Sequence, residues 1–163
     1  MKLVIARHGK AEPDSPTGRD ADRRLTPRGE QQALWLGRSL LAQGFEDALI
    51  LASHAERARR TAEIIGDVLG IQPHLTPHLM IGRSASEAIE VIESNGSADR
   101  LILVGHNPTV SELAGILTHG LNCCHVGLKT GAAALIELKG TATPGHASLE
   151  YIIRLGETED DLT

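Results

Sequence analysis

Short, mainly apolar runs that alternate with segments of helical spacing are the feature that most limits how this chain can fold. The runs at residues 2–6, 48–53 and 100–105 have the length of buried strands. Each is followed by a segment in which apolar residues recur every three or four positions. This alternation predicts parallel strands joined by crossover helices. We therefore expect an α/β fold, a single-domain three-layer α/β/α sandwich with a mostly parallel sheet and one antiparallel edge strand.

Helix signals occupy the segments between these runs. Thr26 followed by Pro27 is typical of a helix start, and Gly44 of its end. This first helix is expected to turn three leucines inward, Leu34, Leu40 and Leu41. The second helix is expected over residues 56–69, ended by Gly70, with four apolar residues on its inner face, Ala58, Ala62, Ile65 and Leu69.

The remaining elements follow from shorter signals. A short strand is expected at residues 74–76, and "SASE" at 84–87 matches a capping box for a helix that reaches Ser94. Asn107 and Pro108 predict the start of a helix that extends to about Thr118.

The last third of the chain has a different pattern. Two apolar runs, 132–138 and 148–155, flank a nine-residue loop with no helical segment, which predicts an antiparallel pair at one sheet edge. The domain is expected to span residues 1–155, followed by an acidic, frayed tail at 156–163.

Composition excludes several classes of function. The formal net charge of the 163 residues is −5, which argues against binding nucleic acid, because that requires cations to neutralise phosphates. No apolar run approaches the roughly 20 residues of a membrane span, and the start of the chain lacks the features of a secretory signal. We therefore expect a cytoplasmic protein that binds neither nucleic acid nor membrane.

The cysteines do not indicate a disulfide framework. Cys123 and Cys124 are the only two and are adjacent, which suits neither disulfides nor a structural zinc site. A soft-metal site formed by His119, Cys123, Cys124 and His125 is an alternative, but the spacing fits no standard site.

Cationic and titratable side chains follow three of the expected strands. Arg7 and His8 follow the first, Arg57 the second, and His106 the strand at 100–105. Because ligands of an open parallel sheet bind beyond the carboxyl ends of its strands, we expect these side chains to gather in one crevice. Guanidinium and imidazole groups would repel one another there unless a dianion lay among them. Arginine matches phosphate oxygens with a planar fork, so the sequence predicts a phosphate site.

A covalent mechanism follows from this arrangement. Nearby positive charge would lower the pKa of His8 and keep its ring neutral and nucleophilic. The ring nitrogen would attack phosphorus in line, and water would then hydrolyse the phosphohistidine. Arg7, Arg57 and His106 would hold the equatorial oxygens. Gly9 would let the backbone turn sharply beside the ring.

Each residue also has a structural explanation. Arg7 could pair with a carboxylate in residues 12–22, and His106 could cap the next helix. Arg23, with Arg24, either extends a basic rim toward a partner or belongs to a solvated loop. Glu87 fits the third position of the capping box better than the role of an acid. The charges of Arg59 and Arg60 are expected at the surface.

Three motifs occur in an informative order: "RHG" after the first strand, S-x-x-x-R-A-x-x-T at 53–61, and "VGH" at the end of a late strand. The chain resembles the histidine phosphatase (phosphoglycerate mutase-like) superfamily. The form "RHGKAE", the segment "DRRLTPRG" at 22–29 and the short length make it most similar to the SixA branch. Members of that branch are described as phosphohistidine phosphatases that act on histidine-containing phosphotransfer proteins.

The resemblance assigns roles to four residues. It implies that His8 is the nucleophile, that Arg7 and Arg57 are phosphate ligands, and that His106 is the second phosphate-binding histidine. It implies no metal ion and no cofactor. The implied partner is a phosphorylated protein of the histidine phosphotransfer type or a small phosphorylated substrate.

Two departures from the family pattern stand out. His54 occupies a position that is commonly Pro. Larger members carry an acid between the second and third motifs, whereas residues 78–87 contain no carboxylate before Glu87. An alkyl phosphate needs an acid to protonate its leaving oxygen, but phosphohistidine releases an imidazole whose conjugate acid has a pKa of about 6.5. The missing acid favours a phosphorus–nitrogen substrate.

Two other functions stay open at this stage. One is a small-molecule phosphomonoesterase, and the other is a non-catalytic module that binds phosphate or phosphoproteins. The sequence leaves undecided whether Thr130 or Gly131, ahead of the fifth strand, donates to the phosphate.

Overall fold

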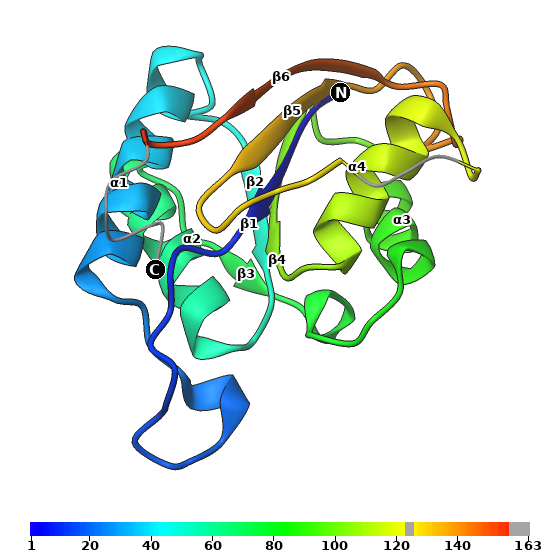
Figure 1. Ribbon diagram of the computed structural model, residues 1–163. Coiled ribbons are helices and arrows are strands. Elements are labelled where there is room, and N and C mark those ends of the chain that lie inside the picture. The colour runs from blue at the N-terminus through cyan, green and yellow to red at the C-terminus, as the bar shows by residue number, and fades with distance from the viewer. Residues whose placement is uncertain (123–125, 157–163) are drawn as a thin grey trace.

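The computed structural model describes residues 1–122 and 126–156 (Figure 1). The strands are β1 (Lys2–Arg7), β2 (Leu49–Ala52), β3 (His74–Leu75), β4 (Arg100–Gly105), β5 (Ala133–Glu137) and β6 (Ser148–Ile153). The α-helices are α1 (Pro27–Ala42), α2 (Glu56–Leu69), α3 (Ala85–Ser94) and α4 (Thr109–His119), and two short 3₁₀ helices are η1 (Asp20–Asp22) and η2 (Pro77–Leu79). The expected α/β alternation is confirmed.

The strands form one sheet in the order β3-β2-β4-β1-β5-β6. β3, β2, β4 and β1 are parallel, whereas β5 pairs antiparallel with both β1 and β6. The C-terminal strands therefore form the expected antiparallel pair at one edge. The strand that runs opposite to the parallel strands is β5, which lies one position inside the edge. β6 follows β5 through a loop without a crossover helix, so it reverses direction again and forms the edge itself.

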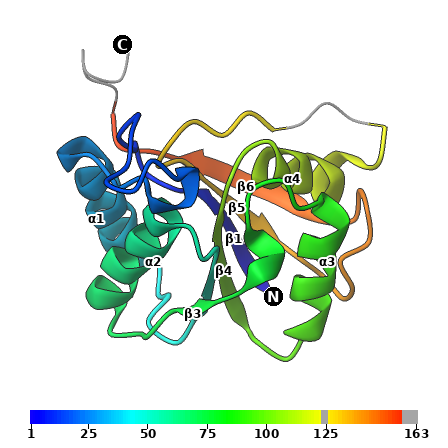
Figure 2. The same cartoon turned by 90° about the horizontal axis from the view of Figure 1, so that it is seen from below.

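Helices cover both faces of the sheet, as Figure 2 shows, with α1 and α2 on one face and α3 and α4 on the other. Alternate residues of the central strands point to opposite faces. Thus Val4 and Ile102 pack with the α1 and α2 side, whereas Leu3 and Leu103 pack with the α3 and α4 side. The three-layer α/β/α sandwich is confirmed, and β1 and β4 are buried at its centre.

The start of α1 agrees with the sequence, but its inner face does not. Thr26 Oγ1 accepts a hydrogen bond from the Gly29 N–H, as expected of an N-cap. Of the three leucines expected inside, only Leu40 is buried, Leu34 is half-buried and Leu41 is 39% exposed. The buried stripe passes instead through Ala33, Leu36 and Gly37. Gly37 lies against Val68, so α2 sets the rotation of α1.

The other helix signals are largely confirmed. All four apolar residues named for α2 are buried, Gly70 ends this helix at φ 74°, and Ser84 forms the capping box of α3 with Glu87. The expected start of α4 is wrong by one position. Pro108 is the N-cap, and the Asn107 side chain instead donates to the Leu128 carbonyl and accepts from Ser111.

None of the helices in the described ranges is long and apolar enough to cross a membrane. Three of the residues considered for the alternative soft-metal site, Cys123, Cys124 and His125, lie outside the described residues, as do residues 157–163 of the acidic tail. Gly156, the first tail residue, accepts a hydrogen bond from Arg28.

Candidate active site

Three neighbouring strands end at the same row of the sheet. Ala6 of β1, Val104 of β4 and Ala52 of β2 are aligned by the parallel pairing. The residues beyond this row therefore meet, although they are distant in sequence. They line a cavity of about 220 Å³, whose walls include the residues Arg7, His8, Lys10, Arg23, Arg57, Ile81, His106, Asn107 and Thr130. The four side chains expected to gather do so.

The two ring nitrogens of His8 have different partners. Nδ1 lies 2.7 Å from the Gly9 carbonyl oxygen, which can only accept, so Nδ1 carries the proton of the neutral ring. Nε2 therefore holds a lone pair, toward which Arg57 Nε–H is directed at 3.4 Å. The side chain is nearly buried, and burial lowers its pKa to about 3, with smaller contributions from His106, Arg57 and Arg7. The ring is neutral as expected, but burial rather than nearby charge is the main cause.

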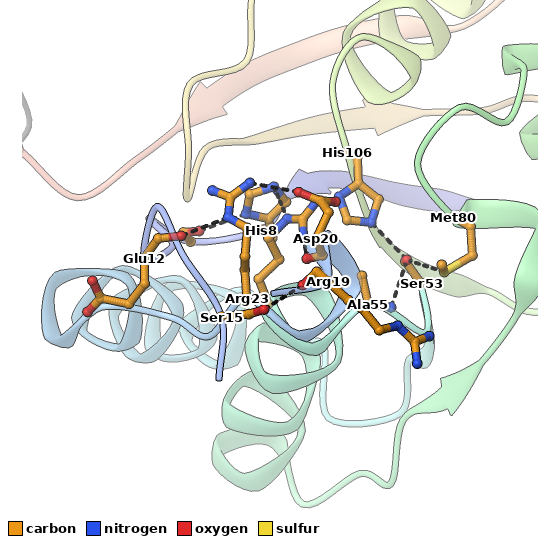
Figure 3. A network of polar contacts seen from close by, with 12 residues as sticks. His8, Glu12, Ser15, Arg19, Asp20, Arg23, Ser53, Ala55, Met80 and His106 are labelled. Carbon is orange, nitrogen blue, oxygen red and sulfur yellow. Dashed lines mark hydrogen bonds and ion pairs between the residues drawn. The ribbon is translucent and has the colours of Figure 1, made fainter. Parts of the chain in front are cut away.

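Arg57 is fixed by a carboxylate that the sequence did not single out. The guanidinium is only 2% exposed, and it donates to the Asp20 backbone oxygen at 2.9 Å and to Asp20 Oδ2 at 3.0 Å. Asp20 also accepts from Arg23 Nη1 at 3.0 Å (Figure 3). These bonds, that from Arg23 first, lower the pKa of Asp20, so its carboxyl is ionised at neutral pH.

Arg7 is not held by a carboxylate of residues 12–22, which was the alternative considered for it. Its Nη1 donates to the Leu128 carbonyl at 3.3 Å, while the loop carboxylate of Asp20 pairs with Arg57 instead. Nε of Arg7 is buried and has no hydrogen-bond partner within the described ranges. A buried guanidinium N–H without an acceptor is costly, and an anion in the cavity would supply one.

His106 faces His8 across the cavity, with 5.1 Å between the ring centroids. Its Nε2 contacts Ser53 Oγ at 2.8 Å, and its buried Nδ1 has no partner among the described residues. Burial, followed by the charge of Arg57, lowers the pKa of His106 to about 4. The ring does not cap α4, since only the His106 backbone oxygen accepts from that helix, through the Val110 N–H.

Gly9 and Gly131, which lie beside His8, are required by packing and by backbone conformation. A Cβ on Gly9 would lie 2.5 Å from the Gly29 carbonyl oxygen, so close packing, rather than a positive φ, requires glycine here. Gly131 does adopt a positive φ of 72°. Its N–H donates to the His8 carbonyl at 2.9 Å and is therefore not directed at a phosphate. Thr130 lines the cavity, and its carbonyl accepts from Arg154.

Of the remaining candidate residues, Arg23 lines the cavity, whereas Arg59, Arg60 and Glu87 do not. Arg23 lines the cavity and bonds Asp20 and the Glu12 carbonyl. Arg59 pairs with Glu56 and Glu63 at the surface, as expected. Two further side chains also match their structural explanation: Arg60, which pairs with Glu30, and Glu87, which completes its capping box.

Comparisons with known proteins show to which family the chain belongs. Residues 3–80 match the model of the histidine phosphatase superfamily (branch 1). The chain is 31% identical over 126 residues to the phosphohistidine phosphatase SixA of Escherichia coli, covering 74% of this chain and 76% of that protein. It is also 33% identical to an uncharacterized protein of Picosynechococcus, with 87% of each chain covered. The chain belongs to the histidine phosphatase superfamily, in its SixA-type branch.

A solved structure shows the same fold. The protein histidine phosphatase SixA complexed with tungstate superimposes with a TM-score of 0.82 at 23% identity, covering 94% of this chain and 97% of that one. Membership of the histidine phosphatase superfamily supports a phosphatase.

Two side chains that contact residues of the candidate site, Asp20 and Ser53, were not predicted from the sequence. Asp20 lies in a polar loop with other acidic residues, and only the folded loop reveals which carboxylate reaches Arg57. Ser53 is the first residue of the second motif, so a signal was present. Its contact with His106 depends on the alignment of β2 with β4.

Proposed function

We propose that the protein hydrolyses phosphohistidine on a phosphotransfer or signalling protein through a phosphohistidine intermediate at His8. One observation carries the proposal: the unprotonated Nε2 of a buried, neutral His8 faces a cavity lined by three arginines and a second histidine. Tungstate is a tetrahedral oxyanion like phosphate, and the complex of SixA with tungstate supports the proposal that this chain also binds such an oxyanion.

The chemical steps need only these side chains and water. The lone pair of His8 Nε2 attacks phosphorus, and the bond between phosphorus and the substrate imidazole breaks with its electron pair on the departing nitrogen. A substrate ring that is protonated on its other nitrogen then leaves as neutral imidazole and takes up no further proton. The arginines and His106 stabilise the charge that spreads over the equatorial oxygens. Water then attacks the phosphorus of phospho-His8, releasing phosphate and restoring the neutral ring. We propose that no metal ion takes part.

The choice of a phosphorus–nitrogen bond rests on the carboxylates near the site. Asp20 is kept ionised by Arg23 and Arg57, so it does not serve as a proton donor at neutral pH. Glu87 is engaged in the capping box of α3 and does not line the cavity. Among the described residues, an alkoxide leaving group would therefore lack its acid, whereas a neutral imidazole leaves without one.

The size and rim of the cavity support the proposal of a protein substrate. The cavity volume of about 220 Å³ is below the range usual for sites that enclose a drug-sized ligand. Lys10 and Arg23 add positive charge at the rim, and Ile81, 50% exposed, adds an apolar contact. A phosphorylated side chain presented by another protein fits such an opening. The cytoplasmic location expected from the sequence stays a prediction.

Turnover of three substrates in the presence of a chelator tests this function. We expect a phosphohistidine-carrying phosphotransfer protein to be hydrolysed with a kcat/KM well above that for sugar phosphates, with para-nitrophenyl phosphate as a general reporter. His8→Ala should abolish all three activities and the acid-labile phosphoenzyme. A preference for sugar phosphates would favour a small-molecule phosphomonoesterase. Tight phosphate binding without turnover would favour a binding module, and loss of activity with chelator would refute metal independence.

A further inference from the structure

Ser53 joins three groups at the edge of the cavity. Its Oγ lies 2.8 Å from His106 Nε2, 3.2 Å from Met80 Sδ and 3.2 Å from the Ala55 backbone nitrogen (Figure 3). Ser53 is fully buried at the end of β2, next to the end of β4 that carries His106. Solvent therefore has little access to this hydroxyl, and its single proton has a limited choice of acceptors.

The protons of this cluster can be counted. The Ala55 N–H is an obligate donor and Met80 Sδ is an acceptor only, whereas a serine hydroxyl donates once and accepts twice. All three contacts are hydrogen bonds only if Ser53 donates to Met80 and accepts from both Ala55 and His106. This assignment places the proton of the neutral His106 ring on Nε2. Nδ1 then bears a lone pair, and Figure 3 shows this nitrogen on the side of the ring toward His8 and Asp20.

We propose that Ser53, oriented by Met80, is a positioning residue that keeps the proton of neutral His106 on Nε2, so that His106 binds a phosphoryl dianion only after Nδ1 takes up a proton from solvent. Proton uptake on binding, the second half of this inference, rests on the proposed function, because it assumes that the cavity receives a phosphoryl group. The tautomer of His106, the first half, concerns the ligand-free protein alone.

The hydrogen-bond partners of His106 explain why Nδ1 takes up a proton when a phosphoryl dianion binds. A lone pair on Nδ1 would repel a phosphoryl oxygen, whereas an imidazolium donates from Nδ1 to that oxygen and continues to donate from Nε2 to Ser53. Arg7, Arg57 and Asp20 are the charged groups whose fields reach His106, and the neutral ring of His8 lies opposite. The arginines disfavour the imidazolium in the free protein, and a bound dianion reverses that balance.

Nitrogen-15 spectra of the full-length protein at pH 7 test the first half. We expect the His106 signals, assigned by their loss in His106→Gln, to show a protonated Nε2 and an unprotonated Nδ1. Met80→Leu removes the acceptor and frees the Ser53 hydroxyl to donate to His106 Nε2. This change should shift the tautomer ratio toward protonated Nδ1 by about five- to tenfold, the ratio corresponding to one neutral hydrogen bond.

If Met80 acts through Ser53, the effect of Met80→Leu on the His106 tautomer ratio must require the Ser53 hydroxyl, and this requirement gives the control. In Ser53→Ala/Met80→Leu the ratio should equal that of Ser53→Ala, because no hydroxyl is left to donate. Ser39→Ala, which removes a serine hydroxyl from α1, should leave the His106 signals unchanged. A wild-type proton on Nδ1, or a Met80→Leu shift that is absent or survives without Ser53, would overturn the assignment.

A titration with sulfate, a dianion that carries no proton at pH 7, tests the second half. At saturation, judged from the arginine side-chain signals, we expect Nδ1 of His106 to become protonated while Nε2 stays protonated. A saturated site with an unprotonated Nδ1 would refute proton uptake. Neither readout depends on turnover, so inactivity toward phosphohistidine would contradict the proposed function without affecting the tautomer assignment.

Discussion

Asp20→Asn should make the protein less stable and its anion binding tighter. The Asp20 carboxylate lies 3.0 Å from a terminal nitrogen of Arg57 and 3.0 Å from one of Arg23. In the proposed function a phosphoryl group binds the same guanidiniums, so the carboxylate and the substrate compete for them, and their like charges repel each other. Asparagine retains an oxygen acceptor for Arg57 and the backbone bond of residue 20, but it removes the charge.

The magnitudes follow from burial. Removing one partner of a fully buried ion pair costs about 3–5 kcal/mol. The Asp20 side chain is 53% exposed and asparagine keeps one hydrogen bond, so solvent screening reduces the expected loss to about 1 kcal/mol. For a domain of this size that loss lowers Tm by about 2–4 °C. Two unit charges about 4 Å apart interact by about 1 kcal/mol in a water-like dielectric and by more in a protein-like one, so removing the charge of Asp20 should tighten phosphate binding at least roughly fivefold.

Two measurements check the expected loss of stability and the expected gain in phosphate affinity. Thermal unfolding without and with phosphate gives the stability change, and inhibition of para-nitrophenyl phosphate turnover gives the phosphate inhibition constant. Asp22→Asn is the matched control, because Asp22 lies in the same η1 turn but contacts Thr17 and Arg19 rather than Arg57. Weaker phosphate binding in Asp20→Asn, or the same tightening in Asp22→Asn, would refute the competition between carboxylate and substrate.

Three further substitutions or conditions have expected outcomes. Gly9→Ala would place a Cβ 2.5 Å from the Gly29 carbonyl oxygen, so urea unfolding should show a loss of about 1–3 kcal/mol. Thr26→Ala removes the N-cap of α1 and should cost about 1 kcal/mol in the same assay, with kcat unchanged. The pKa values of His8 and His106 are lowered from 6.5 to about 3 and about 4, so below pH 6.5 the unfolded chain binds more protons than the folded one. Stability should therefore fall by about 2–4 kcal/mol from pH 7 to pH 5, and a double His→Asn variant that kept this slope would contradict the assignment.

The sequence by itself determined the alternation of strands and helices and the ends of most helices. These features depend on local chemistry, such as the Ser84 and Glu87 capping box and the left-handed Gly70, and local chemistry is readable along the chain. It also determined which four side chains gather in one cavity at the carboxyl ends of the strands. That prediction succeeded because parallel strands bring their carboxyl ends to one edge, whatever the distance between them in sequence.

The tertiary structure alone decided the features that depend on contacts between distant segments. The buried stripe of α1 is set by packing against α2, which turned Leu41 outward although its spacing suits an inner face. Asp20 joined the site because its loop folds back over Arg57, and no local pattern distinguishes it from the neighbouring acidic residues. The low pKa of His8 likewise comes mainly from burial, a property of the packed fold that charge counting along the sequence does not supply.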